Sequence, residues 1–260
     1  MIKLHQQTFG TGKSIVLVHG WAMHSVIWHD FAMQLAEHYQ VTCIDLPGHG
    51  HSENLATFTL EQVADALVAA VSDEQSCWLG WSLGATVVLD IAHRYPERVN
   101  SLVLLAGNPH FTGTEQWPGM KVDLLEAFAE QLTLDAPATL LRFLSLQVAQ
   151  LPDYKVLLKN IKTTIMARAT PNLETLQGGL AILKQADLRS TLGEAQMPIL
   201  VLLGTRDTLV PVAVGEAIKK LAPAIQVAVI DKAGHVPFLS HPQIVLEAIA
   251  EFMDGAHALN

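Results

Sequence analysis

The chain is 260 residues long, half of them hydrophobic and 16% charged, which excludes a disordered chain and is enough for a large core. A formal net charge of -9 makes nucleic acid a poor partner for the molecule as a whole. No apolar run approaches the roughly 18 residues that cross a bilayer, and the N-terminus lacks the apolar stretch of a signal peptide. We therefore expect a cytoplasmic protein that binds neither a membrane nor nucleic acid.

In chain order, the first 110 residues alternate short β-rich runs with helical patterns. One of the helices opens after Thr59, a good N-cap, and carries apolar residues at helical spacing. This alternation predicts a mostly parallel sheet with helices on both faces. The predicted strands are 15–18, 41–44, 78–80 and 102–105, and the predicted helices are about 28–37, 59–71 and 83–93.

The alternation stops between about residues 111 and 189. This stretch contains no convincing strand and reads as several helices interrupted by prolines. Strands resume at 199–203 and 227–230, with one helix between them near 212–221 and another that begins at Pro242. We therefore expect a core made of 1–110 and 190–260. The all-helical insertion 111–189 should form a lid above the strand ends.

The segment Gly80-Trp81-Ser82-Leu83-Gly84 is a G-x-S-x-G motif between a predicted strand and a predicted helix. Such a sharp turn exposes the serine hydroxyl, and its glycines let neighbouring backbone pass closely. The string alone is a weak signal, and the alternative is an ordinary tight turn that contains a serine. Its position between strand and helix favours a nucleophile elbow with Ser82 as the nucleophile.

A serine nucleophile needs a base, and the base needs an acid to orient it. Asp207 and His235 follow consecutive predicted strands, in the chain order serine, acid, histidine that this motif requires. Taken singly, Asp207 could be a turn residue and His235 a surface histidine. Asp231 is the rival acid but lies too near His235 in sequence, and Asp45 is expected to brace its own turn. We expect Ser82, His235 and Asp207 to form a catalytic triad.

The tetrahedral intermediate of acyl transfer carries an oxyanion that needs preorganised donors. The backbone N–H of Leu83, directly after the nucleophile, is one candidate. The second is the N–H of Trp21, because Gly20 before it permits a close backbone approach. Trp21 could instead serve only as a core aromatic residue.

Metal and disulfide chemistry are not expected. The chain has 12 histidines, but they are scattered and no cluster has the spacing of zinc ligands. We therefore predict no metal site and no cofactor. Cys43 and Cys77 lie in apolar, strand-like surroundings and are expected to be reduced and buried.

The motifs described above, together with His19-Gly20-Trp21 and Asp45-Leu46-Pro47-Gly48-His49-Gly50, resemble those of the α/β-hydrolase superfamily. Segments of the insertion, such as 142–147 and 178–184, are similar to the pimeloyl-[acyl-carrier protein] methyl ester carboxylesterase family. The resemblance covers nearly the whole chain. It implies an α/β-hydrolase fold and hydrolysis of the methyl ester of pimeloyl-acyl-carrier protein, with release of methanol, in biotin synthesis.

The same resemblance implies which positions contact substrate. They are Trp21, Ser82, Leu83, Phe143, Leu144, Ser145, Leu146, Gln147 and His235. The chain departs from the family just before Arg142, where other members carry an additional basic residue and this chain has Ala138-Thr139-Leu140-Leu141.

A basic segment lies within the acidic chain. Residues 138–168 contain five basic residues and one acidic residue, a net charge of +4 that leaves -13 for the remainder. Lys155, Lys159 and Lys162 share one face of a helix. Acyl-carrier proteins are acidic, so a positive patch of these lysines and Arg142 could steer one to the enzyme. The alternative is an ordinary solvated lysine face.

There are four alternative functions. The triad equally fits a broad short-chain esterase or a carbon–carbon bond hydrolase of the same fold. A dehalogenase is disfavoured because that reaction requires a carboxylate nucleophile at the position of Ser82. A receptor that uses the pocket without turnover is disfavoured by the three complete catalytic positions. We expect a monomeric esterase.

Overall fold

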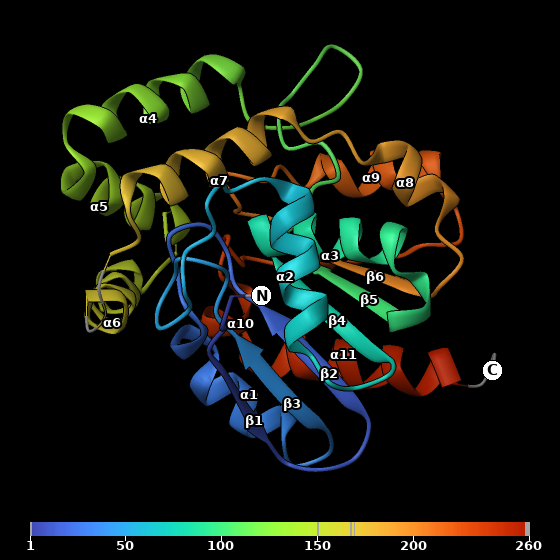
Figure 1. Ribbon diagram of the computed structural model, residues 1–260. Coiled ribbons are helices and arrows are strands. Elements are labelled where there is room, and N and C mark those ends of the chain that lie inside the picture. Colours follow the sequence, from blue (N-terminus) through green and yellow to red (C-terminus); the bar gives the residue numbers. More distant parts are fainter. Residues whose placement is uncertain (1, 150, 167, 169, 258–260) are drawn as a thin grey trace.

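The computed structural model describes residues 2–149, 151–166, 168 and 170–257. Its centre is one seven-stranded sheet with the order β1-β3-β2-β4-β5-β6-β7, shown in Figure 1. Every neighbouring pair is parallel except β1 and β3. The strands are β1 (Gln6–Phe9), β2 (Ser14–Val18), β3 (Gln40–Ile44), β4 (Ser76–Trp81), β5 (Val99–Leu105), β6 (Ile199–Gly204) and β7 (Gln226–Ile230).

The predicted α/β-hydrolase architecture is confirmed. The central strands are continuous apolar runs because both faces of a parallel sheet are covered by helices, and every residue of β4 and β6 is buried. Strand β1 was not predicted. Its first three residues, Gln6-Gln7-Thr8, are polar and exposed, and the strand forms the antiparallel edge of the sheet, where apolar periodicity is weak.

Helices cover both faces of the sheet. In Figure 1, α1 and α11 lie on one face, and α2, α3 and α9 lie on the other. The expected cap is present, since the Thr59 hydroxyl accepts a hydrogen bond from the N–H of Gln62 at the start of α2. The bounds are η1 (Ser25–Trp28), α1 (His29–Leu35), α2 (Leu60–Ala70), α3 (Leu83–Arg94), η2 (Pro96–Arg98), α8 (Arg189–Glu194), α9 (Ala213–Leu221), α10 (Pro237–Ser240) and α11 (Pro242–His257).

The insertion between β5 and β6 forms four helices that gather at one end of the molecule (Figure 1). They are α4 (Val122–Leu134), α5 (Ala136–Gln147), α6 (Tyr154–Met166) and α7 (Leu173–Gln185). The described part of this stretch forms isolated β-bridges but no strand. Helix α7 packs against the loop after β2, because a Cβ on Gly179 would lie 2.5 Å from the Trp21 ring. This helix of the insertion therefore lies next to a loop at the carboxyl end of the sheet.

Two further features of the structure concern its cysteines and the length of its apolar helices. Cys43 and Cys77 are free and buried, as predicted. Within the described residues, none of the helices combines the length and apolar character needed to cross a membrane.

Candidate active site

Ser82 occupies a strained turn between β4 and α3. Its φ of 56° and ψ of −116° lie outside the regions that a serine ordinarily adopts. The turn is tight: a Cβ on Gly80 would lie 2.2 Å from the Gly84 carbonyl oxygen, and a Cβ on Gly84 would lie 2.3 Å from that of Val18. Both positions therefore require glycine. The strand and the helix lock the Ser82 hydroxyl at the carboxyl edge of the sheet.

The three side chains predicted to form a triad are within hydrogen-bond distance. His235 Nε2 lies 2.9 Å from Ser82 Oγ, and His235 Nδ1 lies 2.8 Å from Asp207 Oδ2. The side chains of His235 and Asp207 are fully buried. An Nδ1–H that donates to the carboxylate leaves Nε2 free to accept the serine proton, which is the arrangement a general base needs.

Backbone contacts hold the acid and the base in place. The second carboxylate oxygen of Asp207, Oδ1, accepts hydrogen bonds from the N–H groups of Leu209 at 2.8 Å and Val210 at 2.9 Å. The indole N–H of Trp81 donates to the His235 carbonyl oxygen at 2.7 Å. The loops that carry Asp207 and His235 are thus anchored to their own turn and to the elbow strand, which fixes the geometry before substrate binds.

Neither rival acid belongs to this site. Asp231 is exposed, and its carboxylate accepts a hydrogen bond from the Thr205 hydroxyl at 3.3 Å. Asp45 is buried and accepts from the N–H groups of Ser25 at 2.6 Å and His51 at 2.9 Å. Asp45 therefore braces its own turn, as expected, and also ties that turn to the loop after β2.

The two candidate oxyanion donors lie beside the nucleophile. Within the described residues, the backbone N–H groups of Trp21 and Leu83 have no protein acceptor. A Cβ on Gly20 would lie 3.3 Å from Ser82 Cβ, so this backbone approaches the serine closely. The Trp21 indole is buried, donates to the Leu176 carbonyl oxygen at 2.8 Å and packs on Phe143 with ring centroids 4.7 Å apart. Trp21 is thus a core aromatic residue whose backbone also lies beside Ser82.

Segment 143–147 of α5 divides between two faces. Phe143, Leu144 and Gln147 are buried, and the Gln147 Oε1 atom has no hydrogen-bond partner among the described residues. The end of α5 lies next to the histidine loop, since a Cβ on Gly234 would lie 3.2 Å from the Gln147 carbonyl oxygen. Leu146 is partly buried. Ser145 is exposed and donates to the Leu141 carbonyl oxygen of its own helix, so the structure does not bring its side chain to the site.

The predicted docking residues are exposed on α5 and α6. The Arg142 guanidinium lies 5.4 Å above the Phe128 ring, and the Lys155 ammonium lies 5.9 Å from the Tyr154 ring. Lys159 and Lys162 extend the basic face along α6, and Lys162 also lines a cavity.

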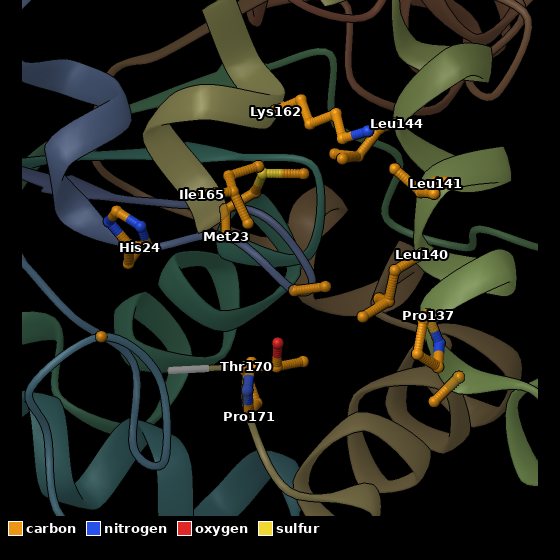
Figure 2. Close-up of a pocket in the computed structure, with 13 residues that line it drawn as sticks. Met23, His24, Pro137, Leu140, Leu141, Leu144, Lys162, Ile165, Thr170 and Pro171 are labelled. Carbon is orange, nitrogen blue, oxygen red and sulfur yellow. The ribbon is translucent and has the colours of Figure 1, made fainter. Parts of the chain in front are cut away.

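That cavity has a volume of about 380 Å³ and lies between α5, α6 and the loop after β2. Figure 2 shows Leu140, Leu141 and Leu144 of α5 on one side and Ile165 of α6 on the other. Three of its lining residues, Ala22, Met23 and His24, come directly after Trp21. Its lining is predominantly apolar and consists of Ala22, Met23, His24, Gly50, Ala136, Pro137, Leu140, Leu141, Leu144, Lys162, Ile165, Thr170 and Pro171.

A group of buried histidines lies beneath the loop after β2. His19 is fully buried, and its ring centroid lies 5.3 Å from that of His49. Burial lowers the pKa of His19 to about 3 and that of His49 to about 4, so both rings stay neutral. The sequence alone predicts only a turn position for His49 and no separate role for His19. Among the described residues, no group of side chains could hold a metal ion.

Comparisons with known proteins place this geometry in a family. A family model described as "alpha/beta hydrolase fold" matches residues 13–242. The "Pimeloyl-[acyl-carrier protein] methyl ester esterase" of Methylococcus capsulatus is 43% identical over 247 residues, which is 95% of this chain and 97% of the relative. The protein of the same name from Salmonella newport is 39% identical over 244 residues, or 94% of this chain and 95% of the relative.

Solved structures agree on the fold. An esterase from Exiguobacterium antarcticum superposes with a TM-score of 0.87 at 22% identity, over 97% of this chain and 96% of its own. An enol-lactonase from Burkholderia xenovorans superposes with a TM-score of 0.82 at 20% identity, over 97% of each chain. The chain therefore belongs to the α/β-hydrolase family and, within it, to the family of pimeloyl-[acyl-carrier protein] methyl ester esterases.

Proposed function

We propose that this chain is a serine carboxylesterase that hydrolyses the methyl ester of pimeloyl-acyl-carrier protein, releasing methanol, in biotin synthesis. The relay of Ser82, His235 and Asp207 supports the reaction type. The match to two methyl ester esterases over more than nine-tenths of the chain supports the substrate.

In the first half of the reaction, His235 Nε2 removes the proton from Ser82 Oγ as the oxygen attacks the ester carbonyl carbon. The oxyanion is stabilised by the N–H groups of Trp21 and Leu83, and Asp207 stabilises the charged imidazolium. The intermediate collapses when the bond to the methoxy oxygen breaks. That oxygen takes the proton from His235 and leaves as methanol, and the acyl group stays on Ser82.

In the second half, His235 removes a proton from a water molecule, which attacks the carbonyl carbon of the acyl-enzyme. The same donors hold the second oxyanion. The bond to Ser82 Oγ then breaks, and the serine recovers its proton from the imidazolium. The product is a carboxylic acid that ionises at neutral pH.

The apolar cavity between α5 and α6 supports an acyl substrate. Its volume of about 380 Å³ falls in the range usual for small-molecule sites, and its leucine-rich lining suits a hydrocarbon chain. Arg142, Lys155, Lys159 and Lys162 lie on the two helices that border it. We propose that this basic face docks the acidic carrier protein while the acyl chain passes through the insertion toward Ser82.

The direct test is hydrolysis of the methyl ester of pimeloyl-acyl-carrier protein, followed by a gel mobility shift and by methanol release. We expect turnover by the wild-type chain and a loss of about 10⁶-fold in kcat for Ser82→Ala, because the nucleophile is removed. Ser82→Ala should also abolish labelling by a fluorophosphonate probe. Ordinary turnover by this variant would contradict the mechanism. Activity on p-nitrophenyl acetate with none on the carrier-bound ester would contradict the substrate.

A further inference from the structure

His19 is a buried imidazole outside the catalytic relay that contacts the backbone next to the nucleophile. It follows β2 directly and is fully buried. Its Nδ1 atom lies 2.8 Å from the Gly20 carbonyl oxygen, and the N–H of Leu46 donates to its Nε2 atom at 3.0 Å. Because Nε2 accepts a hydrogen bond, the single proton of the neutral ring must be on Nδ1. The Nδ1–H therefore donates to the Gly20 carbonyl.

That carbonyl shares a peptide plane with the N–H of Trp21. No peptide bond in the described chain is cis, so the C=O of Gly20 and the N–H of Trp21 point in opposite directions from one rigid plane. A hydrogen bond that fixes the carbonyl also fixes the N–H. The plane lies beside the nucleophile, since a Cβ on Gly20 would lie 3.3 Å from Ser82 Cβ.

Inside the loop, the N–H of Met23 also donates to the Gly20 carbonyl, but at 3.3 Å, a longer contact than the 2.8 Å from His19. Ala22, directly after Trp21, has a φ of 59°, in the left-handed region that disfavours residues other than glycine. At the far end of the loop, the N–H of Ser25 donates to the Asp45 carboxylate at 2.6 Å. The turn after β3 thus supports the loop at both ends, through Leu46 to His19 and through Asp45 to Ser25.

We propose that His19 is a positioning residue that orients the Trp21 N–H toward the oxyanion, through one fixed tautomer and the Gly20 carbonyl. This inference rests on the proposed function only in taking Trp21 as an oxyanion donor. The buried position also lowers the pKa of His19 to about 3, with His49 adding to the effect and Asp45 opposing it. The ring therefore remains neutral, and its Nε2 remains an acceptor, at any pH where the enzyme works.

Two variants separate positioning from simple packing. His19→Asn keeps a side-chain N–H at the position of Nδ1 and loses the acceptor for Leu46. His19→Gln keeps an acceptor near the position of Nε2 and loses the donor to Gly20. We expect kcat to fall by about 10- to 100-fold in His19→Gln and by less than about 5-fold in His19→Asn, since loss of a whole oxyanion donor costs about 10²–10³-fold. KM should change little in either variant.

Three readouts distinguish the outcomes. A trifluoromethyl ketone, whose adduct with Ser82 carries an oxyanion, should bind His19→Gln more weakly by the same factor as kcat falls. Fluorophosphonate labelling and thermal melting report whether Ser82 and the fold are intact. Equal kcat in the two variants, or losses confined to KM and melting temperature, would overturn the proposal. The kinetics can be run on p-nitrophenyl acetate, so a chain inactive on the carrier-bound ester would still test it.

The wild-type enzyme supplies an independent check if either variant does not fold. Nitrogen-15 NMR of the histidine side chains reports which ring nitrogen of His19 carries the proton. We expect protonation at Nδ1 throughout pH 6–8. A proton on Nε2 would break both hydrogen bonds described above and would refute the proposed orientation.

Discussion

The elbow at the carboxyl edge of the sheet and the outer face of the insertion place very different demands on their residues. Around Ser82, a Cβ on Gly80 or Gly84 would lie within 2.3 Å of a backbone atom, so the fold leaves one choice of residue. On α5 and α6, Arg142 and Lys159 are exposed and could change without disturbing the fold. We expect the elbow to set the chemistry and the insertion to set the choice of substrate. Variants in the two regions should therefore fail in different ways.

After the loss expected for Ser82→Ala, the next largest effect is expected at the acid of the relay. Asp207→Asn should lower kcat by about 10⁴-fold, because an amide cannot hold the imidazole of His235 in the required tautomer or stabilise its charge. Stopped-flow or steady-state kinetics on a small ester would measure it, with circular dichroism to show that the fold is kept. A decrease in kcat of less than 10-fold would show that Asp207 is not the acid that orients His235.

A steric change in the elbow should act on stability. Gly84→Ala places a Cβ 2.3 Å from the Val18 carbonyl oxygen, and neither backbone segment can move freely. We expect it to cost about 3 kcal/mol of unfolding free energy, the upper end for overpacking. Gly255→Ala is the matched control, because Gly255 is at an exposed position of α11 where a Cβ meets nothing within 4 Å. It should gain about 0.5–1 kcal/mol. Urea denaturation of both variants would test the difference.

Charge reversal on the insertion should change substrate choice and leave the chemistry intact. Replacing Lys155, Lys159 and Lys162 with Glu should lower kcat/KM on the carrier-bound ester by about 10-fold or more at low salt, since steering of an acidic partner is lost. Turnover of small neutral esters should not change.

The matched control reverses three exposed lysines elsewhere, Lys13, Lys219 and Lys220, and so applies the same change in net charge. It should have little effect on either substrate. Equal losses on both substrates in the α6 variant would indicate a folding defect, and equal behaviour of the two triple variants would rule out a local docking face.

The smallest effect concerns acid. Burial lowers the pKa of His49 from 6.5 to about 4. Between these two pH values His49 is protonated in the unfolded chain but neutral in the folded chain. The unfolding free energy should fall as pH drops from 6.5 toward 4, by about 1.4 kcal/mol per pH unit for such a histidine. His49→Asn should flatten this slope by about that amount in urea titrations between pH 7 and 5. An unchanged slope would contradict the assignment.

The core and the insertion should also respond differently to low pH. Residues 111–189 contain no histidine, whereas His19 and His49 both lie in the core. Mild acid should therefore loosen the core around the loop after β2 before it affects α4 to α7. Amide hydrogen exchange at pH 5 would show whether the two regions respond in that order.

Local sequence patterns are sufficient to predict the alternation of strands and helices, the elbow motif and the chain order of Ser82, Asp207 and His235, because each depends on local periodicity or on residues near a strand end. The same patterns predict an all-helical insertion at 111–189, where strand patterns cease. Strand β1 was not predicted, because a polar antiparallel edge strand has little apolar periodicity.

Which side chains meet depends on the tertiary packing. Packing joins the three residues of the relay across 153 positions of sequence, places Ser145 on the outside of α5, and brings the N–H of Leu46 to His19 Nε2. Such contacts depend on how distant segments pack, and a one-residue shift along a helix turns a side chain by about 100°. Periodicity fixes which face of an element is buried, but the neighbours on that face are set by the fold as a whole.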